Sequence, residues 1–142
     1  MTHLAAPVPD LPEVTGLDQV LGTSLVSLSG DEVVARLEVR PHLHQPFGIV
    51  HGGVYCTLVE TTASLGAATW YGDRGTVVGV SNSTDFLRAV REGVLEVRAR
   101  PVQRGRTQQL WRVDVTDADG RLVATGQVRL ANVPDPAVLA RT

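Results

Sequence analysis

The sequence predicts an α+β domain in which antiparallel strands surround one long central helix. Three observations support this fold class. Several segments alternate apolar and polar residues with the period of two that half-buried strands have. Short turn sequences separate neighbouring strand segments, and a single stretch, residues 53–70, has helical spacing instead. The expected order is two strands, the helix and four strands, and the short hairpins imply an antiparallel meander without parallel crossovers.

Each strand segment has one apolar face and one polar face. In residues 32–40, for example, Leu37 and Val39 oppose Glu38 and Arg40. The same alternation runs through residues 94–102, 109–116 and 121–130. The turns at residues 29–31, 103–105 and 117–120 contain Gly together with polar residues, which is typical of tight connections between antiparallel strands.

The central helix is expected over residues 53–70 (GVYCTLVETTASLGAATW). Its polar residues Thr57, Glu60, Thr61 and Ser64 are spaced i, i+3, i+4 and i+7, so they form one narrow stripe. Most of the remaining circumference is apolar. A helix of this kind is buried, and we expect it to lie under or inside the sheet.

Length and composition predict one soluble cytoplasmic domain. The 142 residues carry a net charge of −2, which gives no support for a nucleic-acid surface. The apolar stretch around Glu60 is too short and too polar for a membrane span, and the N-terminus has no features of a secretory signal. Cys56 is the only cysteine, which excludes an intrachain disulfide. We expect a flexible N-terminal arm at residues 1–14, the folded domain at residues 15–132 and a C-terminal tail at residues 133–142.

Glu60 is the residue most indicative of chemistry. A carboxylate among Leu58, Val59 and Ala63 in mid-helix is costly unless it is paired or used, and no Lys or Arg lies within one helical turn of it. Two interpretations remain open from these residues alone. Glu60 forms an ion pair with a distant arginine, or it takes part in catalysis.

The start of the helix favours the second interpretation. The sequence His51-Gly52-Gly53 places glycines where a ligand can approach the backbone closely. Free N–H groups in the first helical turn stabilise an oxygen that gains negative charge, as an oxyanion hole does. Glu60 lies about two turns further along, so a reacting carbonyl and an attacking water fit between the two, above all across a subunit boundary.

These motifs resemble a known family. The run Gln45-Pro-Phe-Gly-Ile-Val-His-Gly-Gly-Val54 followed by Glu60 is similar to the hotdog-fold acyl-CoA thioesterases of the PaaI-like (phenylacetate-degradation) type, which include the type II 4-hydroxybenzoyl-CoA thioesterases. The resemblance continues through residues 83–88, 91–95 and 100–106, and it covers roughly residues 15–132. It implies a hotdog fold, in which an antiparallel sheet wraps one long helix.

The resemblance also implies roles for individual residues. Gly52 matches the residue whose amide polarises the thioester carbonyl, and Glu60 matches the carboxylate that acts as nucleophile or as general base. Gln45 falls where the benzoyl-CoA branch has a Gln that holds the thioester, although many PaaI-like members have Asn in this loop. Ser64 stands where that branch has a water-binding Thr. In this family the site lies between two subunits, so a homodimer or a dimer of dimers is expected.

The remaining candidates concern substrate binding. Gly53 adds a second amide to the helix start. The resemblance favours Arg88 and Arg106 as contacts of the coenzyme A phosphates, which guanidinium groups bind well, and the alternative is that these arginines are solvated ends of hairpins. His51 either contacts substrate or fixes its own loop through a backbone hydrogen bond. Too few acids and no further cysteine accompany the histidines, so no metal site is expected. No cofactor is expected either, because coenzyme A is part of the substrate.

The predicted function is hydrolysis of an acyl-CoA thioester to a carboxylic acid and free coenzyme A. One alternative is a hotdog hydratase or dehydratase, for which His51 is the only local candidate base. Another is a non-catalytic acyl-CoA-binding module, which has no need for a buried Glu60. The sequence leaves open the identity of the acyl group and the choice between nucleophilic and general-base attack.

Overall fold

Six strands form one antiparallel sheet in the computed structural model, which describes residues 11–141. The helices are α1 (Leu17–Leu21) and α2 (Gly52–Tyr71), and short 3-10 turns cover Pro41–Leu43, Gly72–Arg74 and Pro136–Arg141. The strands are β1 (Ser24–Leu28), β2 (Val33–Glu38), β3 (Thr76–Phe86), β4 (Val94–Arg104), β5 (Gln108–Thr116) and β6 (Leu122–Val133).

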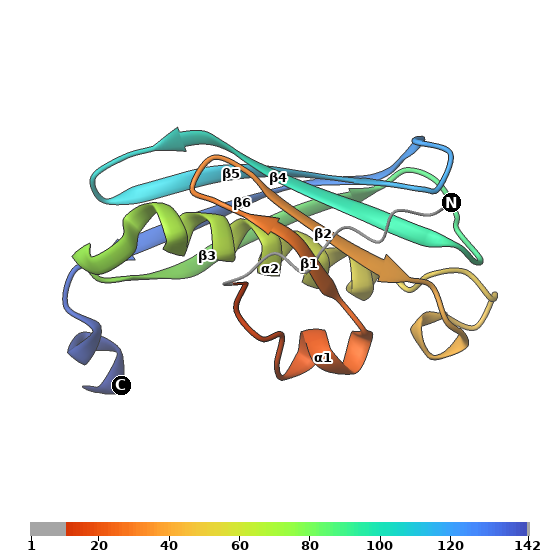
Figure 1. Cartoon of the computed structure of the whole chain (residues 1–142), viewed down its shortest axis with the longest axis horizontal. Helices are drawn as coiled ribbons and strands as arrows, with labels where there is room; N and C mark the ends of the chain where they lie inside the picture. Colours follow the sequence, from red (N-terminus) through yellow and green to blue (C-terminus); the bar gives the residue numbers. More distant parts are fainter. Residues whose placement is uncertain (1–10, 142) are drawn as a thin grey trace.

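The strand order across the sheet is β1-β2-β4-β5-β6-β3. The strands β4, β5 and β6 form the predicted meander, whereas β3 crosses to the far side and pairs with β6. The sheet curves over α2, which runs along its concave face (Figure 1). The α+β architecture with one long central helix is therefore the one that the sequence predicts, and the helix extends one residue beyond the predicted range at each end.

The core lies between α2 and the inner face of the sheet. Leu58, Val59 and Ala63 of α2 are completely buried, as are Trp111 and Val113 of β5. Packing is tight at Gly66 of α2, where an added Cβ would lie 2.5 Å from the Trp111 ring. Glycine is required there because any side chain would push the helix away from the sheet.

The edge strand β3 contains a bulge that decides which of its side chains face α2. Gly79 pairs with Leu130 and Ser81 pairs with Arg129, so Val80 is an extra residue without a partner. In a regular strand Gly79 and Asn82 would face opposite sides, because side chains alternate. The bulge shifts the alternation by one residue, so Gly79, Asn82, Thr84 and Phe86 all stand opposite the buried residues of β6.

The N-terminal part of the described chain includes a helix that the sequence reading did not predict. The five-residue α1 lies between Gly16 and Gly22, which both have positive φ, and the Thr61 hydroxyl donates to Asp18 Oδ2 at 2.7 Å. Residues 1–10 of the predicted flexible arm lie outside the described residues. Between residues 11 and 141, no helix combines the length and the apolar character that crossing a membrane requires.

Candidate active site

The N-terminus of α2 presents one free amide. His51 is the N-cap residue, and its Nδ1 accepts a hydrogen bond from Gly53 N–H at 2.8 Å. This contact occupies the Gly53 amide and corresponds to the loop-fixing role considered for His51. Within residues 11–141 the Gly52 amide has no acceptor, so it is the donor that remains available to a ligand.

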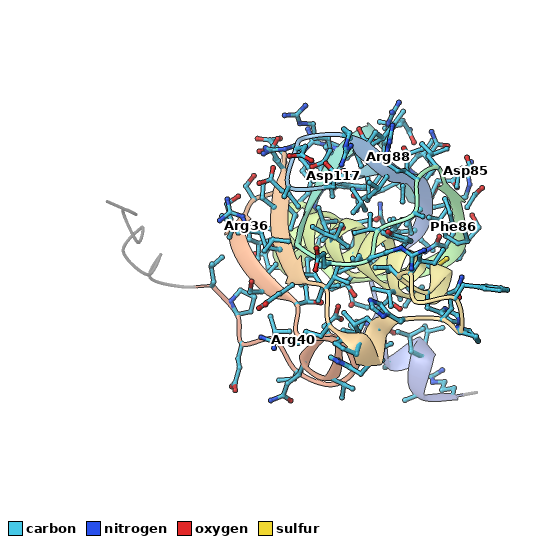
Figure 2. All side chains as sticks on the ribbon, turned by 90° about the vertical axis from the view of Figure 1, so that its right-hand side faces the viewer. Arg36, Arg40, Asp85, Phe86, Arg88 and Asp117 are labelled. Carbon is cyan, nitrogen blue, oxygen red and sulfur yellow. The ribbon has the colours of Figure 1, made fainter. Side chains whose placement is uncertain are left out.

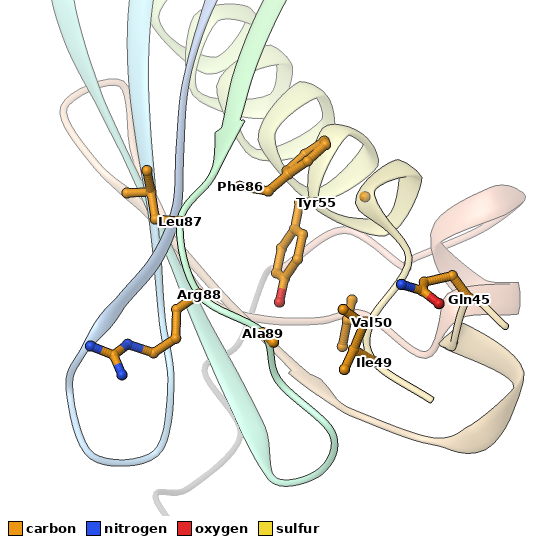
Figure 3. Close-up of a pocket in the computed structure, with 9 residues that line it drawn as sticks. Gln45, Ile49, Val50, Tyr55, Phe86, Leu87, Arg88 and Ala89 are labelled. Atoms are coloured by element: carbon orange, nitrogen blue, oxygen red, sulfur yellow. The ribbon is translucent and has the colours of Figure 1, made fainter. Parts of the chain in front are cut away.

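The loop before α2 holds Gln45 in a fixed orientation. Its backbone N–H donates to Ile49 at 2.8 Å, and its side-chain Oε1 accepts from the Phe47 amide. With Oε1 engaged, the Nε2 group is left to donate, and it points toward the end of α2 (Figure 3). The loop is anchored to the segment after β3, because His44 Nε2 contacts Arg91 O at 2.8 Å.

Gln45 and Gly52 line a cavity of about 280 Å³ at this end of α2 (Figure 3). Its other walls are Ile49, Val50, Tyr55, Phe86, Leu87, Arg88 and Ala89. The Phe86 ring packs beside Tyr55, with ring centroids 5.9 Å apart, and it lies directly over Gly52. The cavity is therefore mostly apolar, and Gly52 and the cationic Arg88 are among its lining residues, which is the usual make-up of a small-molecule site.

Arg88 and Arg106 do not lie together in one chain. Arg88 follows β3 and stands with Phe86 at the end of the molecule seen in Figure 2. Arg106 lies in the β4–β5 turn, where its carbonyl accepts from Asn132, a residue paired with Val77 near the start of β3. Both arginines are exposed, and neither forms a salt bridge within the described part of the chain.

Glu60 is half-buried beside β3 and does not line the Gly52 cavity. Asn82 Nδ2 donates to Glu60 Oε2 at 3.1 Å and to the Cys56 carbonyl at 3.1 Å. The other oxygen, Oε1, lies against the backbone of Gly79, where a Cβ would overlap it. Eight residues of helix separate Glu60 from Gly52, a rise of about 12 Å, so one reacting carbonyl does not reach both within a single chain.

Ser64 and the histidines at positions 42 and 44 do not line the Gly52 cavity. Ser64 is half-buried one turn beyond Glu60, and its hydroxyl has no hydrogen-bond partner in residues 11–141. His42 Nε2 contacts Val20 O at 3.3 Å, so His42 and His44 both bind backbone carbonyls. In the described chain no three His, Cys, Asp or Glu residues are grouped as metal ligands.

The structure adds site residues that the sequence reading missed. Gly79 and Asn82 contact the Glu60 carboxylate, Thr84 binds Asn82, and Tyr55 is a wall of the cavity. The sequence indicates that Asn82 and Thr84 face the helix only if the bulge at Val80 is already known. Without it, alternation from Gly79 predicts that Ser81, Ser83 and Asp85 face the helix.

Comparison with known proteins shows extensive similarity. Residues 47–124 match the family model described as the Thioesterase superfamily. Rv1847 of Mycobacterium tuberculosis is 46% identical over 134 residues, which span 89% of this chain and 96% of that protein. The 1,4-dihydroxy-2-naphthoyl-CoA hydrolase of Listeria monocytogenes is 32% identical over 116 residues, covering 82% and 94%. The crystal structure of S. sahachiroi AziG superposes with a TM-score of 0.83 at 51% identity, covering 85% and 98%.

Proposed function

The chain belongs to the thioesterase superfamily, and from this premise we propose that it hydrolyses acyl-coenzyme A thioesters with Glu60 as the central catalytic group. Family membership confirms the predicted hotdog fold and identifies the protein as a thioester hydrolase. The coenzyme A part of the substrate is inferred from the relative that is named as a CoA hydrolase and from Arg88 and Arg106, which form no salt bridge within residues 11–141. We infer a cytoplasmic enzyme, since acyl-CoA esters are intracellular metabolites.

In the proposed reaction the thioester carbonyl lies at Gly52, where the free amide stabilises the oxyanion. Gln45 Nε2 donates to the thioester from the side of the cavity. Glu60 takes a proton from water, whose oxygen attacks the carbonyl carbon, and the C–S bond then breaks. The sulfur of coenzyme A receives the proton from Glu60 and leaves as the thiol.

A covalent route uses the same groups. A Glu60 oxygen attacks the carbonyl carbon directly and the thiolate leaves. Water then hydrolyses the resulting anhydride, and the proton that this step releases converts the thiolate to the thiol and leaves Glu60 ionised. Both routes give one carboxylic acid and one thiol, and the Ser64 hydroxyl is available to bind the water in either. The reaction requires water as its only co-substrate, so we propose that no metal or organic cofactor takes part. A hydratase reaction needs a free histidine base, whereas His51 Nδ1 is bound to Gly53.

We propose that the site forms between two copies of the chain that pair through β3. This strand has 11 residues and a free edge, and Val80 and Phe86 are more than half exposed on it. Antiparallel pairing of two β3 strands brings the end at Phe86 beside the partner's end at Thr76. Gly52 then meets the second copy's catalytic carboxylate, and Arg88 meets its β4–β5 turn arginine. A tetramer of two such dimers is the larger assembly that we propose.

Exchange of Glu60 for glutamine tests the proposed function. The change keeps the size of the side chain and removes its basicity and nucleophilicity, so kcat should fall about 100-fold or more while KM changes little. Release of free thiol from a panel of acyl-CoA esters measures both constants. Glu38→Gln is the matched control, because Glu38 is exposed and paired with Arg40 away from the cavity. A folded Glu60→Gln enzyme with the kcat of the parent would contradict the proposal.

A further inference from the structure

We propose that Asn82 and Thr84 are positioning residues that hold the Glu60 carboxylate in its reactive orientation. The inference deepens the proposed function, since it rests on the catalytic role of Glu60. Within residues 11–141 the Glu60 side chain makes one hydrogen bond, which Oε2 accepts from Asn82 Nδ2 at 3.1 Å. The same Nδ2 group also donates to the Cys56 carbonyl, one turn before Glu60 on α2.

Thr84 holds the far end of the Asn82 amide. An asparagine amide has a donor end and an acceptor end, and rotation by half a turn exchanges them. The ionised Glu60 carboxylate and the Cys56 carbonyl can only accept hydrogen bonds, so they select the donor end of the amide. The Thr84 hydroxyl donates to Asn82 Oδ1 at 2.7 Å and so fixes the opposite end of the same amide. The Thr84 contact therefore restricts the movement of the donor that binds Glu60.

The two carboxylate oxygens are made unequal by this arrangement. Oε2 is fixed by Asn82, whereas Oε1 has no hydrogen-bond partner in the chain from residue 11 to 141. Oε1 occupies space that exists only because residue 79 is glycine. The geometry assigns Oε1 as the oxygen that accepts the proton of water or attacks the thioester carbon. A carboxylate with one fixed and one free oxygen is preorganised, because it loses little orientational freedom when the substrate binds.

The bulge in β3 brings these parts together. Because Val80 is the extra residue, Gly79, Asn82 and Thr84 lie on the helix-facing side of one strand. Gly79 supplies the space, Asn82 the donor and Thr84 the hydroxyl that fixes the donor. Bulges are frequent beside active sites because they redirect side chains in this way. Asn82 is exposed and Thr84 is only partly buried, so neither belongs to the hydrophobic core.

Three substitutions on one strand test the role of Thr84. Thr84→Val keeps the shape and removes the hydroxyl, so kcat should fall about tenfold or more with KM nearly unchanged, because orientation and not binding is lost. Thr84→Ser keeps the hydroxyl and should retain a kcat close to that of the parent enzyme. Ser83→Ala removes a hydroxyl from the opposite face of β3 and is the matched control. Equal kcat values for the Val and Ser variants, with both proteins folded by circular dichroism, would overturn the proposal.

A double-mutant cycle separates this inference from the proposed function. If Thr84 acts through the carboxylate, Thr84→Val should have no further effect on the residual rate of the Glu60→Gln enzyme. The same fold-loss in both backgrounds would show that Thr84 acts by another route, and the inference would fail while the catalytic role of Glu60 stands. If Glu60→Gln itself has the kcat of the parent enzyme, the proposed function fails first and the positioning role fails with it.

Discussion

Tyr55 has a buried hydroxyl without a hydrogen-bond partner in the described chain. The residue is 3% exposed, and its ring forms part of the wall of the Gly52 cavity (Figure 3). Burial raises the pKa of Tyr55 to about 12, so the phenol stays neutral and keeps its proton near neutral pH. A buried unpaired hydroxyl lowers the free energy of unfolding by about 1–3 kcal/mol, so Tyr55 destabilises the folded protein at this position.

Removal of that hydroxyl should therefore stabilise the protein. We expect Tyr55→Phe to raise the free energy of unfolding by about 1 kcal/mol and Tm by about 3 °C, because the ring packing is kept and the unpaired group is lost. Thermal unfolding followed by circular dichroism gives both quantities. Tyr71→Phe is the control, since the Tyr71 hydroxyl is not among the buried unpaired atoms. A less stable Tyr55→Phe protein would mean that the hydroxyl has a partner in solution.

At the same scale, the catalytic candidates differ in how far the sequence could predict them. Glu60 can be identified from the sequence because a carboxylate among apolar helical residues is unusual and costly. Gly52 can be identified because it is the first of two glycines at the start of that helix. Asn82 and Thr84 are ordinary strand residues, and the side of β3 that they face depends on the extra residue Val80 earlier in the strand. The Gly53 amide, which we expected to be free, donates a hydrogen bond to the His51 ring, and the sequence does not indicate this contact.

Among the elements, β2 and β4 are joined on the outer face of the sheet by an ion cluster. Glu32 Oε2 pairs with Arg100 Nε at 2.7 Å, and Glu32 Oε1 pairs with Arg98 at 2.7 Å. The hydrogen bond from Arg100 is the main cause that lowers the pKa of Glu32, and Arg98 adds to it against the opposing effect of desolvation. The ionised form of Glu32 is thus favoured by the fold.

The lowered pKa of Glu32 predicts how the free energy of unfolding changes with pH. The stabilisation is present above the unfolded pKa of Glu32, near 4.5, and is lost as pH falls through the lower folded value. Glu32→Gln should therefore cost a few tenths to about 1 kcal/mol at pH 7, and the difference should vanish in strong acid. Urea unfolding of both proteins at pH 7, 5 and 3 measures it. A difference that grows on acidification would contradict this explanation.

The elements also show what a local reading of sequence cannot supply. The central helix and the last three strands were predicted because each carries its own periodic pattern. Helix α1 was not, because five residues are too few to be stable alone and this helix depends on the Asp18–Thr61 contact. The placement of β3 beside β6 is a property of the whole sheet, and no pattern within residues 76–86 encodes it.

For the whole molecule, the proposed site between two subunits makes assembly a condition of activity, because Glu60 and Gly52 are separated along α2. A mixture of two inactive variants should therefore regain thioesterase activity. In a mixture of Glu60→Gln and Gln45→Ala chains, each mixed dimer has one site with both substitutions and one site with neither. If the subunits exchange freely, about half of the dimers are mixed, so activity should return to about a quarter of the parent value.

Thiol release before and after co-refolding of the two chains measures this complementation. The control is a refolded mixture of Glu60→Gln with Glu60→Gln/Gln45→Ala, in which no site is intact. If each chain carried a complete site, the refolded mixture would show no more than the average of the two separate variants. That result would refute a site shared between subunits.

The extra residue at Val80 makes the effect of a deletion in β3 depend on its position. Deletion of Val80 would place Asn82 two positions after Gly79, so a regular strand would keep Gly79, Asn82 and Thr84 on the helix-facing side. Deletion of Ser83 would leave the bulge in place and turn Thr84 to the outer face. We therefore expect a β3 strand that is one residue shorter to keep its helix-facing side chains only when the residue lost is at the bulge.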